Sequence, residues 1–475
     1  MGIREYASYD GLGLAELVRK GEVSASELAE EAISRIEKHN PALNAVVLKL
    51  YDLGRSMAKA PADSAFKGVP FLLKDAFGDI AGYPSRLGSR FRAETPASED
   101  SALARRFRAS GVSFLGKTNV PEFTLLPTTE SALYGPARNP WNVNHSTGGS
   151  SGGAAAAVAA GIVPLAHAND SGGSIRIPAS SCGLVGLKPS RARTSFAPDY
   201  GDVLSGLCHE HVVTRSVRDS AAMLDATQGA EPGDPYMAPP PERPYLEEIK
   251  REPGKLRIAF SKKNANGALL HADCVKGVEE VAKRLAALGH DVVEDAPALK
   301  PDEPASLFLP LWASWLASEI EGEAARRGRG PEENELEPLT RGLYEVGKSI
   351  SAAQYLMLVK EAQNLTRRVG AFMTKYDVWL TPTLAAPPIP LGTININEPD
   401  PMMAFAPAAD YVPFTPIQNI TGQPSLSLPL CMSESGLPVG MMFSARYGDE
   451  ATLFRLAAQL EQEMPWKDRH PAIWN

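Results

Sequence analysis

The chain has 475 residues, a formal net charge of −8, 44% hydrophobic residues and 22% charged residues. These are ordinary values for a globular protein, and the length is sufficient to bury a large core. The acidic balance argues against nucleic acid as the main partner, because phosphate binding depends on patches of Lys and Arg.

The four cysteines, Cys182, Cys208, Cys274 and Cys431, are scattered and form no C-x-x-C pair. A disulfide framework and a structural zinc site are therefore not expected, and neither is any other metal or cofactor. The N-terminal run MGIREYASYDG contains no apolar segment typical of a signal peptide, and the apolar stretch 154–165 is too short to span a bilayer. We expect a cytoplasmic protein with no membrane partner.

The first sixty residues have a helical pattern. Ser24 and Glu27 have the spacing of a capping box, and Pro41 is expected to end the helix that follows. From 68 to 187 the pattern changes to short apolar runs separated by glycine-rich turns. We expect strands at 69–73, 112–115 and 162–166, and a tightly packed helix at 154–160.

The second half continues the alternation of strands and helices. Strands are predicted at 256–260, 291–293, 377–380, 426–430 and 439–443, with helices at 274–288 and 451–461. Residues 301–370 form a helical, charge-rich stretch. The alternation predicts an α/β layer architecture, and since no long linker interrupts it, we expect a single domain over 1–475.

Residues 111–118 match the P-loop pattern G-x-x-x-x-G-K-T. The middle of this segment is apolar and strand-like, whereas a phosphate loop presents bare backbone N–H groups. Pro121 also leaves no room for the long helix that should begin at Lys117. We interpret the segment as a buried strand and turn.

Residues 148–152 match the nucleophile elbow G-x-S-x-G. An elbow needs a buried strand immediately before it, but residues 141–147 are polar and loop-like. No later histidine lies in a recognisable catalytic setting. The sequence therefore does not favour an α/β-hydrolase.

Ser150 combines instead with the later run DSGGSIRIPA at 170–179. Successive glycines let backbone N–H groups point to one place, because glycine accepts positive φ, and such a group of donors can hold a developing oxyanion. Taken alone, either segment also fits a tight glycine turn with a surface serine.

Three segments in this order resemble the amidase signature enzymes: GVPFLLKD at 68–75, GGSSGG at 148–153 and DSGGSIRIPA at 170–179. Supporting segments are KTNVPE at 117–122, RNPWN at 138–142, GLVGLKP at 183–189 and TGQP at 421–424. Within the family, the runs HAND at 167–170 and SSCG at 180–183 look most similar to bacterial amidases like 6-aminohexanoate cyclic dimer hydrolase. The resemblance is weakest between about 301 and 368.

The resemblance implies a large mixed, mostly parallel central β-sheet covered by helices on both faces. Its catalytic core would span about 68–190, and the variable helices about 301–370 would lie on the substrate side. The chain would be an amidohydrolase acting on carbon–nitrogen bonds other than peptide bonds, with no cofactor.

Carried over by position, Ser174 would be the nucleophile, Ser150 a bridging serine in a cis peptide, and Lys74 the base. The N–H groups of Ser171, Gly172 and Gly173, together with that of Ser174, would form the oxyanion hole.

This chemistry requires an uncharged lysine. A free lysine has a pKa near ~10.4, and burial lowers lysine pKa values by up to ~3–5 units. The apolar residues 69–73 before Lys74 favour such burial. The alternative for Lys74 is an exposed lysine at a strand end, paired with Asp75.

Asp170 and Arg176 lie on either side of Ser174 in the sequence. We expect them to form an ion pair that holds the glycine turn rigid, with Ser151 also supporting the site. The alternative is two unrelated surface charges.

The substrate is expected to be a small or oligomeric amide, with carbamates and esters as further possibilities. Thr124 and Leu125 are candidate pocket residues, as is Trp312 in the variable helical stretch, although core packing explains such residues equally well. The alternative function is the glutaminase component of an amidotransferase, working in a complex for tRNA-linked amidation. We expect a monomer or homodimer.

Overall fold

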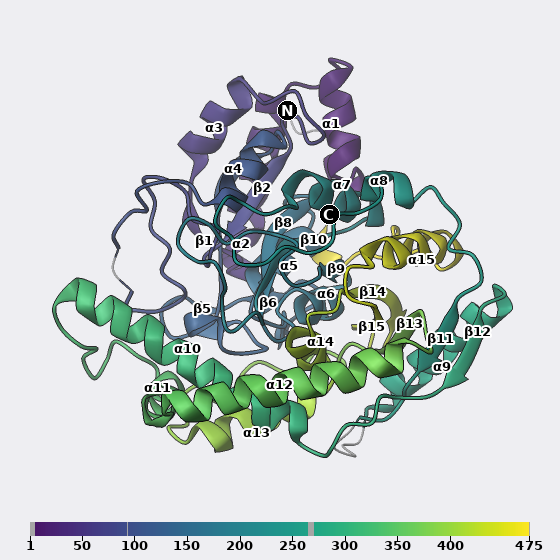
Figure 1. Cartoon of the computed structure of the whole chain (residues 1–475). Helices are drawn as coiled ribbons and strands as arrows, with labels where there is room; N and C mark the ends of the chain where they lie inside the picture. The colour runs from purple at the N-terminus through teal and green to yellow at the C-terminus, as the bar shows by residue number, and fades with distance from the viewer. Residues whose placement is uncertain (1–4, 93, 265–269, 475) are drawn as a thin grey trace.

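An eleven-stranded sheet runs through the middle of the molecule (Figure 1). The structure is a computed structural model that describes residues 5–92, 94–264 and 270–474. The strands of the main sheet are β1 (Val46–Lys49), β2 (Pro70–Lys74), β3 (Ser113–Thr118), β8 (Leu165–Asp170), β9 (Val185–Lys188), β10 (His209–Thr214), β11 (Arg257–Phe260), β12 (Asp291–Glu294), β13 (Val378–Pro382), β14 (Ser425–Met432) and β15 (Pro438–Ala445). Their order across the sheet is β1-β3-β2-β8-β10-β9-β14-β15-β13-β11-β12. Two small two-stranded sheets pair β4 (Glu130–Ser131) with β5 (Gly135–Pro136) and β6 (Arg138–Asn139) with β7 (Asn142–Ser146).

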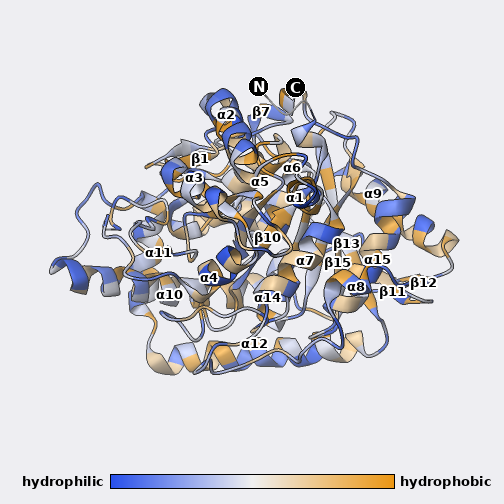
Figure 2. Ribbon diagram, turned by 90° about the horizontal axis from the view of Figure 1, so that it is seen from above, coloured by the Kyte–Doolittle hydropathy of each residue, from blue (hydrophilic) through white to orange (hydrophobic). Residues whose placement is uncertain are grey.

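Helices cover both faces of this sheet. They are α1 (Gly11–Arg19), α2 (Ala25–Leu43), α3 (Tyr51–Lys59), α4 (Ala102–Ala109), α5 (Gly152–Ala159), α6 (Arg176–Cys182), α7 (Val217–Thr227), α8 (Tyr245–Glu248), α9 (Ala272–Ala287), α10 (Glu303–Arg327), α11 (Pro338–Ser349), α12 (Ala352–Met373), α13 (Pro401–Tyr411), α14 (Thr415–Thr421) and α15 (Glu450–Glu463). Figure 2 shows α2, α5, α6 and α9 on one side of the sheet and α4, α7 and α15 on the other. The predicted α/β fold, a large mixed sheet between two layers of helices, is confirmed. In the part of the chain that the structure describes, no helix is long and apolar enough to cross a membrane.

The expectation that parallel pairs predominate is wrong. Among the described strands, β2–β3, β2–β8, β11–β12 and β11–β13 are parallel, whereas six further neighbouring pairs are antiparallel. The cause is partly topological, because β10 inserts between β8 and β9 and runs antiparallel to both. In addition, β14 and β15 follow each other through a short turn, which imposes an antiparallel pair.

Several predicted boundaries differ from the structure by a few residues, and two of them are informative. The strand expected at 162–166 is Leu165–Asp170. Its end was missed because His167, Asn169 and Asp170 are polar although they are buried, so hydrophobicity does not indicate them. The capping box of Ser24 and Glu27 is confirmed, but α2 passes through Pro41 and ends at Leu43. Asn44, with a φ of 49°, forms the left-handed cap.

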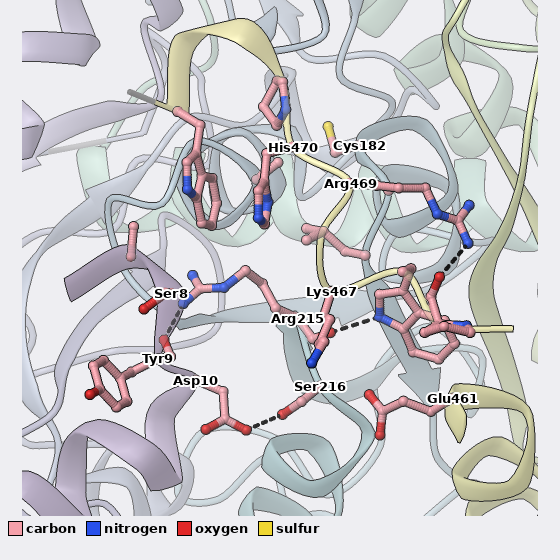
Figure 3. A pocket seen from close by; sticks show the side chains of 18 of the residues that line it. Ser8, Tyr9, Asp10, Cys182, Arg215, Ser216, Glu461, Lys467, Arg469 and His470 are labelled. Atoms are coloured by element: carbon pink, nitrogen blue, oxygen red, sulfur yellow. Dashed lines mark hydrogen bonds between the residues drawn. The ribbon is translucent and has the colours of Figure 1, made fainter. Parts of the chain in front are cut away.

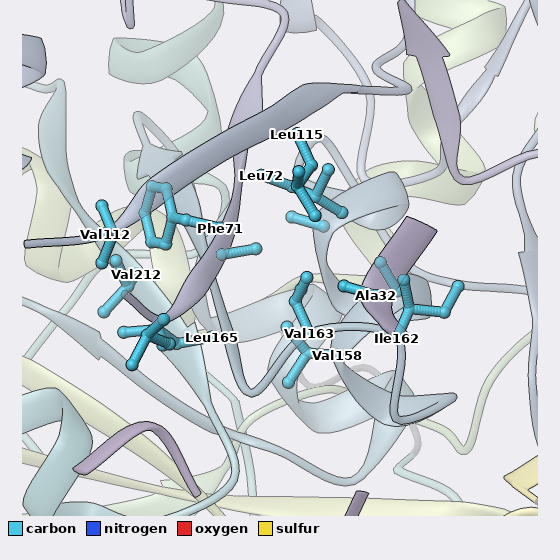
Figure 4. Packing of buried hydrophobic residues seen from close by; sticks show 14 of the residues in the cluster. Ala32, Phe71, Leu72, Val112, Leu115, Val158, Ile162, Val163, Leu165 and Val212 are labelled. Carbon is cyan, nitrogen blue, oxygen red and sulfur yellow. The ribbon is translucent and has the colours of Figure 1, made fainter. Parts of the chain in front are cut away.

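The core beneath the signature segments joins β2, β8 and α5. Phe71, Leu72, Leu165 and Val158 are fully buried and lie in one cluster (Figure 4). This packing fixes β2 beside the parallel strand β8, and the carboxyl ends of neighbouring parallel strands meet at the same edge of a sheet. Lys74 ends β2 and Asp170 ends β8, so the two signature segments meet at this edge.

The stretch 301–370 is largely helical, as predicted, and comprises α10, α11 and most of α12. A pair of buried carboxyl groups connects α11 to the signature half of the chain. Glu122 accepts a hydrogen bond from the N–H of Glu337 at 2.8 Å, and Glu337 accepts one from the N–H of Ala132 at 2.6 Å. Burial, together with the nearby Glu122 charge, raises the pKa of Glu337 to about 8.

This raised pKa predicts a pH-dependent stability. A carboxyl group whose pKa is higher in the folded than in the unfolded state stabilises the fold while it is protonated, and that contribution disappears as the pH rises through about 8. We therefore expect Glu337→Gln to exceed wild type in Tm at pH 9 by about 2 °C or more, and the gap to close toward pH 5. Thermal unfolding from pH 5 to 9 checks this, with the exposed Glu333→Gln as the control. Parallel curves for wild type and Glu337→Gln would contradict the account.

Candidate active site

Lys74 is fully buried at the end of β2. Its Nζ lies 2.7 Å from Ser150 Oγ and 2.6 Å from Asn169 Oδ1. The neighbouring Asp75 accepts a hydrogen bond from the Tyr134 hydroxyl at 2.8 Å instead of pairing with the lysine. The alternative of an exposed lysine paired with Asp75 is therefore wrong.

Ser150 lies in the turn between β7 and α5 and is also fully buried. The Gly149–Ser150 peptide is cis, as the resemblance implied. A side-chain carbon built on Gly148 would lie 3.0 Å from Pro178 Cα, so this turn rests on the first residues of α6. The start of α6, two residues after Ser174, is thereby brought to the Ser150 turn.

Residues 142–146, expected to be loop-like, form the strand β7. It belongs to a small two-stranded sheet, and its first three residues are exposed. A nucleophile elbow requires a buried strand at this place, so the structure gives no support to that arrangement.

Ser174 lies in the turn between β8 and α6 and is 5% exposed, whereas Lys74 and Ser150 are each 0% exposed. The preceding Gly173 has a φ of 138°, and a side-chain carbon there would lie 2.3 Å from Thr415 Oγ1. Only glycine fits both the conformation and the space. The turn therefore presents Ser174 at a position that the glycine determines.

The predicted ion pair between Asp170 and Arg176 forms, and both residues are fully buried. Arg176 Nε and Nη2 each donate to the carboxylate at 2.9 Å. Burial opposes ionisation of Asp170, but the Arg176 charge and hydrogen bonds outweigh it and hold the pKa of this carboxyl well below its usual range. The Gly173 N–H also donates to the carboxylate at 2.7 Å, so the pair closes the turn before Ser174.

That last hydrogen bond changes the predicted oxyanion hole. The Gly173 N–H is already occupied by Asp170 and is not a free donor. Within the described ranges, the N–H groups of Ser171, Gly172 and Ser174 have no hydrogen-bond acceptor in the protein. These three groups are the donors that the turn offers to a ligand.

Sequence reasoning missed a second clamp on the turn, supplied by α14. Thr415 Oγ1 donates to the Gly172 carbonyl at 2.6 Å, and Asn419 Nδ2 donates to the Asp170 carbonyl at 2.9 Å. Both residues lie within the six positions before the run TGQP at 421–424, which was the available signal. Ser151, expected to support the site, is buried and donates to the Asn169 carbonyl at 3.2 Å.

The electrostatics of the site act on the Lys74 amine. Burial lowers its pKa to about 7, against the opposing influence of Glu210, Cys208 and Asp170. Near neutral pH a large fraction of the amine is therefore uncharged, and an uncharged amine can accept a proton from the adjacent Ser150 hydroxyl. In the described part of the chain, no group of three or more His, Cys, Asp or Glu side chains is arranged to hold a metal ion.

An apolar wall lies against the turn. A side-chain carbon on Gly172 would lie 2.5 Å from Phe308 Cζ and 3.2 Å from Trp312 Cζ3. Leu125 belongs to the same apolar cluster as Trp312. Thr124 is buried in the same loop as Leu125, and its N–H donates to the Pro121 carbonyl at 3.0 Å. Of the three predicted pocket residues, Trp312 therefore lies against the Gly172 turn. Leu125 belongs to the apolar cluster of Trp312, and Thr124 lies beside Leu125 in the same loop.

The segment 111–118 is a strand and turn, as interpreted. It forms β3, and the buried Lys117 donates to the Pro84 carbonyl at 2.7 Å. The chain then enters the short turn of helix Glu122–Thr124, which gives no long helix for a phosphate loop.

A cavity of about 320 Å³ is lined in part by Cys182, the last residue of α6, and by Arg215 (Figure 3). The two chain ends and the start of α7 line it, and it contains none of the predicted site residues. Arg215 donates to the Tyr9 carbonyl across it, and Ser216 donates to Asp10 at 2.7 Å. No sequence pattern indicates this cavity, because its lining comes from distant segments that carry no common motif.

Comparison with known proteins gives one consistent result. The Amidase family profile matches residues 27–454. The chain is 37% identical to the 6-aminohexanoate-cyclic-dimer hydrolase of Paenarthrobacter ureafaciens, over 98% of this chain and 97% of the relative. The structure of 6-aminohexanoate cyclic dimer hydrolase complexed with substrate is similar at a TM-score of 0.95 and 36% identity, covering 99% of this chain and 100% of the other. A bacterial aryl acylamidase of the amidase signature family is similar at a TM-score of 0.87 and 27% identity, covering 96% of each chain.

The buried ion pair generates a stability prediction. Arg176→Met leaves the Asp170 carboxylate buried without its cation, and breaking a buried pair in this way costs about 3–5 kcal/mol. The matched control is Arg55→Met, which breaks the exposed pair of Arg55 with Glu30 and is expected to leave stability almost unchanged. Urea unfolding measures both values. Unchanged stability of Arg176→Met would show that the pair does not hold the turn.

Proposed function

Because this chain belongs to the amidase family, we propose that it is a serine amidohydrolase that cleaves carbon–nitrogen bonds through an acyl-enzyme on Ser174. The observation that carries the proposal is the contact of 2.7 Å between Lys74 Nζ and Ser150 Oγ, fully buried beside the 170–174 turn. A buried amine on a serine hydroxyl is the arrangement needed to activate a second serine without histidine.

In the proposed reaction, uncharged Lys74 accepts the proton of Ser150, and Ser150 takes the proton of Ser174. Ser174 Oγ then attacks the carbonyl carbon of the substrate amide. The free N–H groups of Ser171, Gly172 and Ser174 hold the oxyanion. The relay returns the proton to the leaving amine, and water hydrolyses the acyl-enzyme by the same path.

We propose small or oligomeric aryl and aliphatic amides as substrates. Two similarities support this class: one relative is named for hydrolysis of a cyclic dimer of 6-aminohexanoate, and another is an aryl acylamidase. The aromatic wall of Phe308 and Trp312 against Gly172 suits an apolar chain or ring beside the reacting carbonyl. Carbamates and esters present a similar carbonyl and belong in the substrate panel.

One prediction from the proposed function concerns the nucleophile. Ser174→Ala is expected to lower hydrolysis by about 10⁴-fold or more, because no acyl-enzyme can form. The assay uses anilides, linear and cyclic aliphatic amides, carbamates and esters. A fluorophosphonate probe followed by peptide mapping should label Ser174 in the wild type and leave Ser174→Ala unlabelled.

The control is Ser349→Ala. The Ser349 hydroxyl lies at the exposed end of α11, so this substitution is expected to leave turnover unchanged. Near-normal turnover or labelling of Ser174→Ala would refute the nucleophile assignment. Hydrolysis that requires ATP and a second protein would favour the amidotransferase alternative.

Another prediction from the proposed function concerns the base. Because burial lowers the pKa of Lys74 to about 7 and its uncharged form is the active one, kcat/KM should rise with pH through about 7 and then level off. Lys74→Met should remove activity at every pH and leave the fold intact, since within the described part of the chain the amine makes hydrogen bonds to Ser150 and Asn169 and no ion pair. A rate that falls as the pH rises from 6 to 8 would contradict Lys74 as the base.

A further inference from the structure

A buried histidine and glutamate lie directly behind Lys74. His167 Nε2 is 2.6 Å from Glu210 Oε2, and both residues are almost completely buried. The backbone N–H of Lys74 donates to His167 Nδ1 at 3.1 Å. Glu210 on β10 is directly opposite Asn169 on β8, the residue whose amide oxygen holds the lysine amine.

On the basis of the proposed function, we propose that Glu210 and His167 are positioning residues for Lys74. His167 anchors the backbone of the lysine. Glu210 supplies a negative charge that stabilises the ammonium group formed when Lys74 takes the proton. Asn169 completes the unit by holding Nζ in line with Ser150.

The hydrogen bonds define the state of the histidine ring. Nδ1 accepts a hydrogen bond from the Lys74 N–H, so the ring proton is on Nε2 and is donated to Glu210. The Gly78 backbone packs closely against the ring, because a side-chain carbon added at Gly78 would lie 2.8 Å from His167 Nδ1. The Phe107 ring packs on the histidine with its centroid 5.5 Å away. A fixed ring gives Lys74 a fixed backbone.

Glu210 is the unbalanced charge near the amine. Among the described residues, the titratable and charged groups around Lys74 are its chain neighbour Asp75, Asp170 and His167 on β8, Glu210 on β10, Cys208 directly before β10, and Lys117 on β3. Asp75 is held by the Tyr134 hydroxyl, and burial raises the pKa of its carboxyl. Asp170 is neutralised by Arg176, and burial raises the pKa of the Cys208 thiol and keeps it uncharged. Lys117 is directed to the Pro84 carbonyl. Glu210 pairs with the neutral His167 ring rather than with a fixed cation. Burial raises the pKa of this carboxyl, and the hydrogen bonds of His167 and Asn169 oppose that shift.

This arrangement has a definite consequence for the reaction. When Lys74 accepts the proton, a positive charge appears in a buried site, and a nearby carboxylate stabilises it. The same carboxylate favours the charged amine in the resting enzyme and so raises the pH at which Lys74 becomes active. Removing the charge should therefore lower the plateau rate and move the acidic limb of the profile to lower pH.

The test is the pH profile of kcat/KM on an anilide for wild type, Glu210→Gln and Glu210→Asp. Glu210→Gln keeps the size and a hydrogen-bond acceptor for His167 but removes the charge. We expect its plateau to fall about 10-fold and its acidic limb to move down by about one pH unit. Glu210→Asp keeps the charge and should restore the position of the limb.

The matched control is Glu450→Gln, which removes another fully buried carboxylate, the partner of Arg193, away from Lys74. It should leave the acidic limb in place. A limb that stays at the wild-type pH in Glu210→Gln would overturn the inference, while the lysine-dependent limb of the wild type would still support the proposed function. An inactive wild type would instead refute the proposed function itself.

Should Glu210→Gln fail to fold, His167→Asn provides the second measurement. Asparagine can accept the Lys74 N–H near the former Nδ1 but cannot reach Glu210, which then loses its donor and is neutralised by burial. The acidic limb should again move to lower pH. An unmoved limb in this variant would also overturn the inference.

Discussion

The site depends on one interaction, the burial of the Lys74 amine on the Ser150 hydroxyl and the Asn169 amide oxygen. Removing an ammonium group from water disfavours its charge, and here burial outweighs the surrounding negative groups. The chemistry that the proposal needs is thus a consequence of packing. β2 delivers the lysine into the interior because its preceding residues, such as Phe71 and Leu72, are core residues.

A buried amine is useful only if the groups around it are held in place. The turn with Ser174 is held from two sides, by the carboxylate of Asp170 in its pair with Arg176 and by Thr415 and Asn419 of α14. The charged pair is satisfied by several hydrogen bonds, the condition under which buried charges are tolerated. Helix α14 therefore stabilises a turn that lies far from it in the sequence, since Thr415 is 243 residues after Gly172.

The site residues were predicted from polar side chains in an apolar or glycine-rich setting and from the family resemblance. GVPFLLKD, GGSSGG and DSGGSIRIPA led to Lys74, Ser150 and Ser174. The structure brings the first two into contact, and the catalytic roles of all three are our proposal. The ion pair of Asp170 with Arg176 was also predictable, since the two charges flank one turn. The layered α/β fold followed from the alternation of apolar runs.

Other features were not visible in the sequence because they depend on long-range pairing. The antiparallel insertion of β10 put Glu210 beside Asn169, and no local pattern indicates which strand lies next to β8. The strand β8 was misplaced because His167, Asn169 and Asp170 are polar and yet buried. The occupied N–H of Gly173 could be seen only once the Asp170 carboxylate had a position.

The central claim, a buried amine that is uncharged near neutral pH, can be measured directly by NMR titration of protein labelled with ¹³C at lysine Cε. Comparison with Lys74→Arg assigns the resonance of Lys74. The account predicts that this resonance titrates near a pH of about 7. Titration near ~10.4, the value of a lysine in water, would contradict it.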